Sequence, residues 1–236
     1  MNAREECIVL LDNGSLRPEA VRSLRTIAVN LGRHIGEKVH PVSLLHSSKI
    51  DPEALDGREA DTWRRFLRRR IEVGEARVRV VPLFFGPSSA IADYLPKVTA
   101  EVVARFGPAE VRVARPLMDP SERGDDAVAA ILEDLLIQKL NTMDDRSCAV
   151  VVVDHGSPVR AVTECRDRVA VQLGERLGGR VLGVLAASME RREGSEYDFN
   201  EPLLAGALST AKERGWRRLI LSYLFFSPGR HAGPAG

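Results

Sequence analysis

CAVVVVDHGSPVR, residues 148–160, is an apolar run that ends in an acid, a histidine, a glycine and a serine. CIVLLDNGSLRPE, residues 7–19, has the same pattern, with Asn13 in the place of His155. A short, continuously apolar run is typical of a strand buried on both faces of a parallel sheet. The chain therefore contains two related strand-and-loop segments, and only the second has the histidine.

A second pair of segments repeats at nearly the same spacing. VRVVPLFFGPSSA (78–90) and RLILSYLFFSPGRH (218–231) share the core LFF-x-P. Phe84 and Phe225 are 141 residues apart, and Asn13 and His155 are 142 apart. Two matches at almost one offset indicate an internal duplication.

Each copy alternates strand patterns with helix patterns, which predicts a parallel sheet with helices on both faces. We expect an α/β fold of two tandem three-layer αβα modules related by a pseudo-twofold duplication. The first module is predicted at 1–140 and the second at 147–236, with NTMDDRS (141–147) as the linker. Within the second module we expect strands at 148–153, 180–187 and 217–226. We expect helices at about 160–177 and 203–214.

The second copy also lacks the elements that follow the LFF segment in the first copy, about fifty residues there by the repeat's own spacing. We therefore expect the chain to be truncated at its C-terminus, as a fragment would be. Missing elements would leave an exposed sheet edge, so homodimerisation remains open.

The charge of the chain is balanced. Lys and Arg number 34 and Asp and Glu number 33, so the formal net charge is +1. This balance gives no reason to expect nucleic acid or a membrane surface as a partner. The basic run WRRFLRRR (63–70) is the local exception, and we interpret it as a solvated helix face.

The cysteines and the apolar segments indicate a cytoplasmic protein. Cys7, Cys148 and Cys165 form neither a disulfide framework nor a CxxC site, and the first two open matching strands, where we expect buried thiols. The sequence has no apolar segment near 18 residues and no signal-peptide core at its N-terminus.

Three chemically active side chains follow predicted strands of the second copy. His155, Glu190 and His231 each come directly after a strand, so we expect them at the carboxyl edge of one sheet. Imidazole and carboxylate are ligands for Co, Ni, Fe and Zn. Gly156 and Gly229 permit close backbone approach beside the two histidines.

The first copy does not repeat this set. Asn13 replaces His155, Ala90 replaces His231, and His46 falls near the position of Glu190. An amide, an imidazole and a methyl group do not make a comparable metal site, so we expect the first module to be degenerate.

Three segments, VVVDHGSP, MERREGSEYDFNEPLL and LSYLFFSPGRHAGPAG, resemble the signature regions of the sirohydrochlorin chelatases, the CbiX-type class II chelatases. Both halves take part, so the chain resembles the long, two-module form. The resemblance departs at Met189, where the family has leucine, at Tyr223, where proline is common, and at Glu201-Pro202, an acid-proline pair displaced by an insertion.

The resemblance implies a lyase that inserts a divalent metal into sirohydrochlorin, in cobalamin or sirohaem biosynthesis. The metal is the second substrate, Co²⁺ or Fe²⁺, with Ni²⁺ also compatible, and no other cofactor is implied. His155 and His231 match the family's two histidines and would hold the metal, and Glu190 would be a ligand or a proton acceptor.

A tetrapyrrole that bears many carboxylates needs cations at the rim of its site. The expected substrate-binding residues are Ser157, Arg160, Gly229 and Arg230. Further arginines of the same segments, Arg166, Arg191 and Arg192, are candidates for the same bidentate role.

Three alternatives remain open at this stage. A ferrochelatase for another porphyrin would use the same fold with an apolar, aromatic lining. A non-catalytic tetrapyrrole or metal carrier would bind without turnover. A metal-dependent hydrolase would need a further carboxylate cluster, which the sequence does not show.

Overall fold

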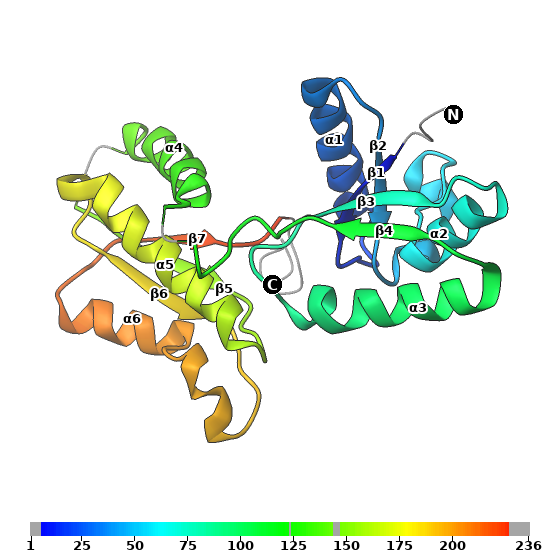
Figure 1. Ribbon diagram of the computed structural model, residues 1–236. Helices are drawn as coiled ribbons and strands as arrows, with labels where there is room; N and C mark the ends of the chain where they lie inside the picture. The colour runs from blue at the N-terminus through cyan, green and yellow to red at the C-terminus, as the bar shows by residue number, and fades with distance from the viewer. Residues whose placement is uncertain (1–5, 123, 144–146, 227–236) are drawn as a thin grey trace. The chain divides into compact units, whose positions relative to one another are not determined.

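The computed structural model describes residues 6–122, 124–143 and 147–226, and these form two compact units (Figure 1). The first unit contains the described residues up to Leu117 together with Phe226, and the second contains those from Met118 to Phe225. Both are α/β units with parallel sheets, so the predicted fold class is confirmed. The helix α4 (Ala127–Asn141) lies in the second unit, whereas the sequence analysis placed its residues at the end of the first module.

The first unit has a four-stranded parallel sheet in the order β2-β1-β3-β4. Its strands are β1 (Cys7–Asp12), β2 (Val39–Ser43), β3 (Arg77–Pro82) and β4 (Glu110–Val113). Its helices are α1 (Pro18–Ile35), α2 (Trp63–Glu72) and α3 (Leu95–Phe106), with a π-helix, η3 (Ala90–Tyr94), directly before α3 and short 3₁₀ turns at η1 (Ser47–Lys49) and η2 (Pro52–Leu55).

Strand β1 divides the core of the first unit into two faces because successive side chains alternate. Val9 and Leu11 pack in one cluster with Trp63 of α2 and Val98 of α3. The intervening Ile8 and Leu10 pack in another cluster with Leu24 and Ala28 of α1. The helices therefore cover both faces of the sheet, as the continuous apolar pattern of β1 predicted.

The second unit has a three-stranded parallel sheet in the order β6-β5-β7. Its strands are β5 (Ala149–Asp154), β6 (Val184–Ser188) and β7 (Leu219–Tyr223). Its helices are α4, α5 (Arg160–Leu177) and α6 (Leu204–Glu213), with 3₁₀ turns at η4 (Gly178–Arg180) and η5 (Ser195–Asn200). The expected helix at 160–177 is confirmed, and the other expected elements lie within a few residues of the observed ones.

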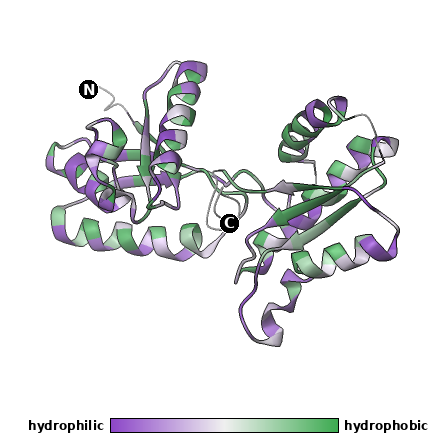
Figure 2. Cartoon of the chain, turned by 180° about the vertical axis from the view of Figure 1, so that it is seen from behind, coloured by the Kyte–Doolittle hydropathy of each residue, from purple (hydrophilic) through white to green (hydrophobic). Residues whose placement is uncertain are grey.

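All six residues of β5 are buried, and β5 is the central strand of its sheet. Val151 and Val153 pack with Ala207 of α6, while α5 contacts the strand from its other side. Helix α4 packs on α5 (Figure 1). In Figure 2 the strands of this sheet are coloured as hydrophobic, which fits their central position.

The hydrogen bonds at the sheet edges confirm the duplication residue by residue. Leu83 N donates to Leu11 O at 2.7 Å, and Leu224 N donates to Val153 O at 2.8 Å. Likewise the last residues of β2 and β6 each form an isolated parallel bridge, Ser43 with Thr62 and Ser188 with Leu203. The two units are thus copies of one hydrogen-bonded framework.

The basic run of α2 is a solvated helix face, as predicted. Trp63, Phe66 and Leu67 are buried, whereas the arginines form ion pairs on the outer side. These pairs are Arg64–Glu101, Arg65–Glu59, Arg68–Glu72, Arg69–Asp61 and Arg70–Glu75. Among the described residues, no helix is both long and apolar enough to cross a membrane.

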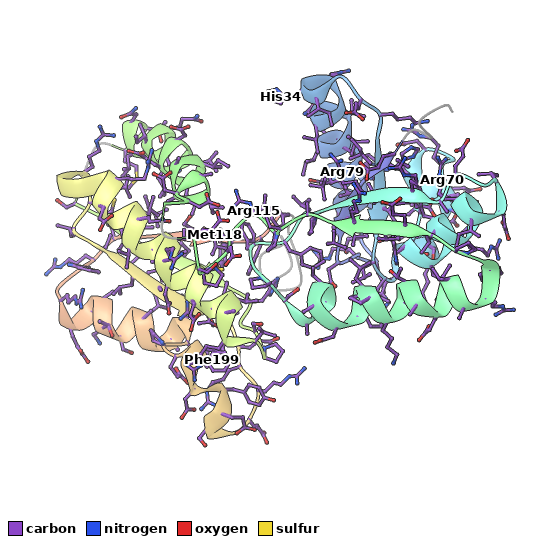
Figure 3. The ribbon with its side chains drawn as sticks, in the orientation of Figure 1. His34, Arg70, Arg79, Arg115, Met118 and Phe199 are labelled. Carbon is purple, nitrogen blue, oxygen red and sulfur yellow. The ribbon has the colours of Figure 1, made fainter. Side chains whose placement is uncertain are left out.

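The three cysteines are free and buried, which confirms the predicted buried thiols of Cys7 and Cys148. Cys165, on α5, lies with its sulfur 4.0 Å from the carbonyl oxygen of Met118 (Figure 3). Burial raises the pKa of the Cys165 thiol to about 11, so this sulfur stays protonated at neutral pH.

Asp12, the last residue of β1, has a largely buried carboxyl group. Its Oδ1 atom has no hydrogen-bond partner among the described residues. Burial raises the pKa of Asp12 above its ordinary 3.8, although a hydrogen bond from Ser43 and one from the backbone of Gly14 oppose the shift. The ionised carboxylate is therefore a destabilising element of the first unit.

We predict that Asp12→Asn becomes more stable relative to wild type as the pH rises. A raised folded-state pKa adds stability below pH 3.8, and that contribution is lost as the pH rises through the folded-state pKa. Thermal unfolding of the variant and of wild type, measured from acid to neutral pH, gives the difference. Asp93→Asn, at an exposed site, is the control, and equal pH dependence in both variants would contradict the prediction.

Candidate functional site

His155 follows β5 directly and is exposed at the carboxyl edge of the second sheet. Its imidazole stacks on the ring of Phe225, with centroids 4.0 Å apart and planes inclined by 14°. Phe225, which follows β7, stacks in turn on Tyr223 at 5.1 Å. The imidazole is therefore held against an aromatic pair at the end of the neighbouring strand.

Glu190 lies beside His155, because the backbones of the two loops meet. The Glu190 N–H donates to the carbonyl oxygen of His155 at 3.2 Å. Gly156 makes this approach possible: its φ is +88°, and a Cβ atom there would lie 1.9 Å from the carbonyl oxygen of Glu190. The structure thus brings together two of the three predicted metal ligands, both exposed at one sheet edge.

The loop after His155 is fixed by Asn200, which is fully buried. Asn200 accepts the Ser157 N–H at Oδ1, 2.9 Å away, and donates from Nδ2 to the Ser157 carbonyl, also at 2.9 Å. The Ser157 hydroxyl accepts the Val159 N–H at 3.0 Å, at the start of α5. Backbone and side chain of Ser157 are thus committed to the loop, and its contact with a substrate stays a prediction.

Arg166 is not at the rim, so the expectation that it contacts a substrate there is wrong. Its side chain is 1% exposed. The guanidinium donates to Ser188 Oγ and to the Asn200 carbonyl, and it lies 3.8 Å from the carboxylate of Asp154. Burial raises the pKa of Asp154, against the opposing effects of the Ser188 hydroxyl and the Arg166 charge.

The arginines that do lie on the surface are held by aromatic or acidic neighbours. The Arg160 guanidinium lies over the ring of Phe199, 4.6 Å from its centroid. Phe199 is on η5 and is labelled in Figure 3. Arg192 lies over Tyr197 at 5.8 Å. These cation–π contacts leave the edges of the guanidinium groups available for hydrogen bonds.

Arg191 is used differently, since it pairs with Asp198 and Glu201. The Leu203 backbone N–H and the Arg191 guanidinium lower the pKa of Glu201. Arg191 therefore closes the loop between β6 and α6 on itself and has less capacity for a substrate carboxylate than Arg160 or Arg192.

The first unit has the same backbone framework but a different set of side chains. Leu45 N donates to Asn13 O at 3.2 Å, the same bond that Glu190 makes to His155. Leu45 therefore stands in the position of Glu190, and His46, expected near that position, is the next residue. Asn13 and Leu45 supply no imidazole or carboxylate, in agreement with a degenerate first module.

His231, Gly229 and Arg230 lie outside the described residues, so their predicted roles stay predictions. Within the part of the chain that is described, no three side chains of His, Cys, Asp or Glu gather closely enough to hold a metal ion. His155 and Glu190 are thus two members of a set whose third predicted member is not placed.

The fold of the chain is that of chelatase structures. SirB from Bacillus subtilis, solved with Fe³⁺, matches with a TM-score of 0.60 and 15% identity over 95% of this chain and 90% of its own. DR2241 from Deinococcus radiodurans, a multi-domain protein with structural similarity to chelatases and two additional novel domains, matches with a TM-score of 0.50 and 16% identity. That match covers 92% of this chain and 51% of DR2241.

No protein-family profile matches the chain, and no curated protein matches it either. At 15–16% identity the structural likeness establishes the chelatase-like α/β fold. The structural likeness does not identify the substrate or the metal, which have to be inferred from the residues of the site.

Sequence reasoning missed Asn200, the burial of Arg166 and the stacking of Phe225 on His155. The offset between the copies could have located Arg166, because it is the residue of α5 that corresponds to the apolar Leu24 of α1. An arginine at a position that is apolar in the other copy signals a buried polar partner. No comparable signal exists for Asn200, which acts across a long loop.

We predict that Gly156→Ala separates Glu190 from His155. The added methyl group would meet the Glu190 carbonyl, and a residue at positive φ is itself strained by roughly 1–2 kcal/mol. Gly215→Ala is the control, because Gly215 also has positive φ but has open space around it. Amide NMR spectra and thermal unfolding should show a larger stability loss, with shifts at His155 and Glu190, in Gly156→Ala alone.

Proposed function

We propose that the chain is a chelatase that inserts Co²⁺ or Fe²⁺ into sirohydrochlorin, in cobalamin or sirohaem biosynthesis in the cytoplasm. The observation that carries the proposal is the hydrogen bond between the His155 and Glu190 backbones, at the carboxyl edge of a chelatase-like sheet. It places an exposed imidazole and an exposed carboxylate on adjacent strand ends, where open α/β sheets bind their ligands.

In this proposal His155 and His231 hold the incoming metal ion, and Glu190 is a ligand or a proton acceptor. Metal insertion releases two protons from the pyrrole nitrogens, so the site needs both metal-binding atoms and a base. Nitrogen and carboxylate oxygen suit divalent Co, Fe and Ni. The stacking of His155 on Phe225 supports a fixed ring orientation, so that the metal enters from one defined direction.

The substrate carboxylates are assigned to Arg160 and Arg230, with Ser157 and Gly229 as further substrate-binding residues. The placement of Arg160 over Phe199 supports its part in this assignment, because a guanidinium held over an aromatic ring can still donate N–H groups to a carboxylate. The arginines of these segments, Arg160 and Arg192, favour a polycarboxylate tetrapyrrole over an apolar porphyrin.

We predict that His155→Ala abolishes metal insertion while the fold is retained. The test follows the visible absorbance of sirohydrochlorin, under anaerobic conditions, with Co²⁺ or Fe²⁺ and the purified chain. His46→Ala is the control, since His46 is an exposed histidine at the corresponding edge of the first unit. The expected result is the spontaneous rate for His155→Ala and wild-type turnover for His46→Ala.

Turnover by His155→Ala equal to that of wild type would contradict the assignment of the site. If wild type itself does not exceed the spontaneous rate but binds one equivalent of metal or tetrapyrrole, the chain is a carrier. A catalyst and a carrier are distinguished by the amount of metallated product. A catalyst releases more product than there is protein, whereas a carrier binds its ligand stoichiometrically.

We predict that Arg160→Met raises the KM for sirohydrochlorin and leaves kcat nearly unchanged. The expected loss is roughly 10-fold in kcat/KM, as for one charge-assisted hydrogen bond. Arg214→Met is the control: Arg214 makes the same kind of contact, 5.0 Å from the Trp216 centroid, at the end of α6 that precedes β7. An equal loss in both variants would show that the effect is not local to the site.

A further inference from the structure

We propose that Arg166 is a positioning residue: its buried guanidinium fixes, through two chains of hydrogen bonds, the Gly156–Ser157 backbone that presents His155. The relevance of this role to catalysis rests on the proposed function, whereas the positioning itself is a property of the metal-free chain. Arg166 lies on α5, behind the edge, and cannot itself reach a substrate because it is 1% exposed.

The first chain of hydrogen bonds runs through the end of β6. Arg166 Nη1 donates to Ser188 Oγ at 2.5 Å, and the Ser188 hydroxyl donates to Asp154 Oδ1 at 2.5 Å. The same carboxylate oxygen accepts the Gly156 N–H at 3.0 Å. The two residues on either side of His155 are thus joined by one carboxylate, which Arg166 orients through the serine.

The second chain runs through Asn200. Arg166 Nη1 donates to the Asn200 carbonyl at 2.9 Å, which fixes the end of η5. Asn200 Oδ1 accepts from Ser157 N at 2.9 Å and from Thr163 Oγ1 at 3.1 Å, and its Nδ2 donates to the Ser157 carbonyl. The backbone on the far side of Gly156 is therefore held from the opposite loop.

Arginine suits this place because its donors point in several fixed directions at once. While Nη1 serves both chains, Nε and Nη2 donate to Asp167 Oδ1 at 2.9 and 2.7 Å. The buried cation thereby lies between two carboxylates, those of Asp154 and Asp167. A lysine has a single nitrogen, so it could not serve both chains and also present two further N–H groups to Asp167.

The first unit shows the same loop without this device. The seventh residue of α1 is Leu24, where the seventh residue of α5 is Arg166. There Ser47 Oγ bonds to both the N–H and the carbonyl of Ser15, the serine that corresponds to Ser157. The loop fold alone therefore does not need an arginine, and the arginine accompanies the copy that has the histidine.

Arg168 offers a matched control on the same helix. Its guanidinium also donates to backbone carbonyls, those of Asp119 at 3.3 Å and Glu122 at 3.0 Å, together with that of Pro120. These bonds fix the segment before α4, which is not the Gly156–Ser157 loop. Arg168→Met therefore removes guanidinium hydrogen bonds from the same helix without removing any that lead to the Gly156–Ser157 loop.

The experiment measures amide hydrogen exchange by NMR in the metal-free chain for wild type, Arg166→Met and Arg168→Met. We expect protection at Gly156 and Ser157 to fall about 10-fold or more in Arg166→Met, with the β5 amides unchanged and with no such loss in Arg168→Met. Unchanged protection at both amides in Arg166→Met, or equal losses in the two variants, would overturn the proposal.

A second measurement covers the case in which Arg166→Met does not fold. Native-state exchange of the wild-type chain in low denaturant should then show Gly156 and Ser157 opening together with the amides of β5. If Gly156 and Ser157 instead exchange at a much lower opening free energy than the β5 amides, as in an unprotected loop, the proposal is overturned. Neither measurement uses sirohydrochlorin or a metal.

Turnover separates this proposal from the proposed function. In an active chain, Arg166→Met should lower kcat for metal insertion with KM nearly unchanged, because a displaced His155 weakens the transition state rather than substrate binding. Lost protection in a chain whose wild type has no activity would refute the proposed function and leave the positioning role intact. Normal turnover with unchanged protection in Arg166→Met would overturn the positioning role alone.

Discussion

The burial of a carboxylate at the end of the central strand is the constraint on which the second unit depends. Asp154 is withdrawn from water where β5 ends, and an uncompensated charge there would be costly. Arg166 and Ser188 compensate it, and in doing so they join α5, β5 and β6 at one point. The same Asp154 oxygen that needs a counter-charge also accepts the Gly156 N–H. The groups that compensate the charge of Asp154 therefore also fix the geometry of the loop.

The two units show two solutions to the same problem. Asp12 occupies the position of Asp154, but Leu24 supplies no cation and one carboxylate oxygen is left without a described partner. The first unit keeps the framework, with its glycine at positive φ and its cross-loop hydrogen bond, and has lost the imidazole and the carboxylate. The same framework can therefore be built with or without an imidazole and a carboxylate at its edge.

Much of the fold could be predicted because apolar periodicity and duplication are local, repeated signals. The run 148–153 gave a buried central strand, and the offset between the copies gave the equivalence of Asn13 and His155. The proximity of His155 to Glu190 followed from the rule that parallel strands end at one edge. The exposure of each arginine did not follow, because the same residue type serves as a buried cation at Arg166 and an aromatic-stacked surface group at Arg160.

The placement of α4 was also beyond sequence reasoning, since a helix rich in apolar residues does not specify which of two similar units it packs on. The hydrogen bonds of Asn200 have a different consequence. They anchor the far end of the segment that begins at Glu190, so residues 191–199 form an excursion tied down at both ends. Side chains within such a segment can be changed without moving the backbone at either anchor, and so without moving the imidazole beside which the segment starts.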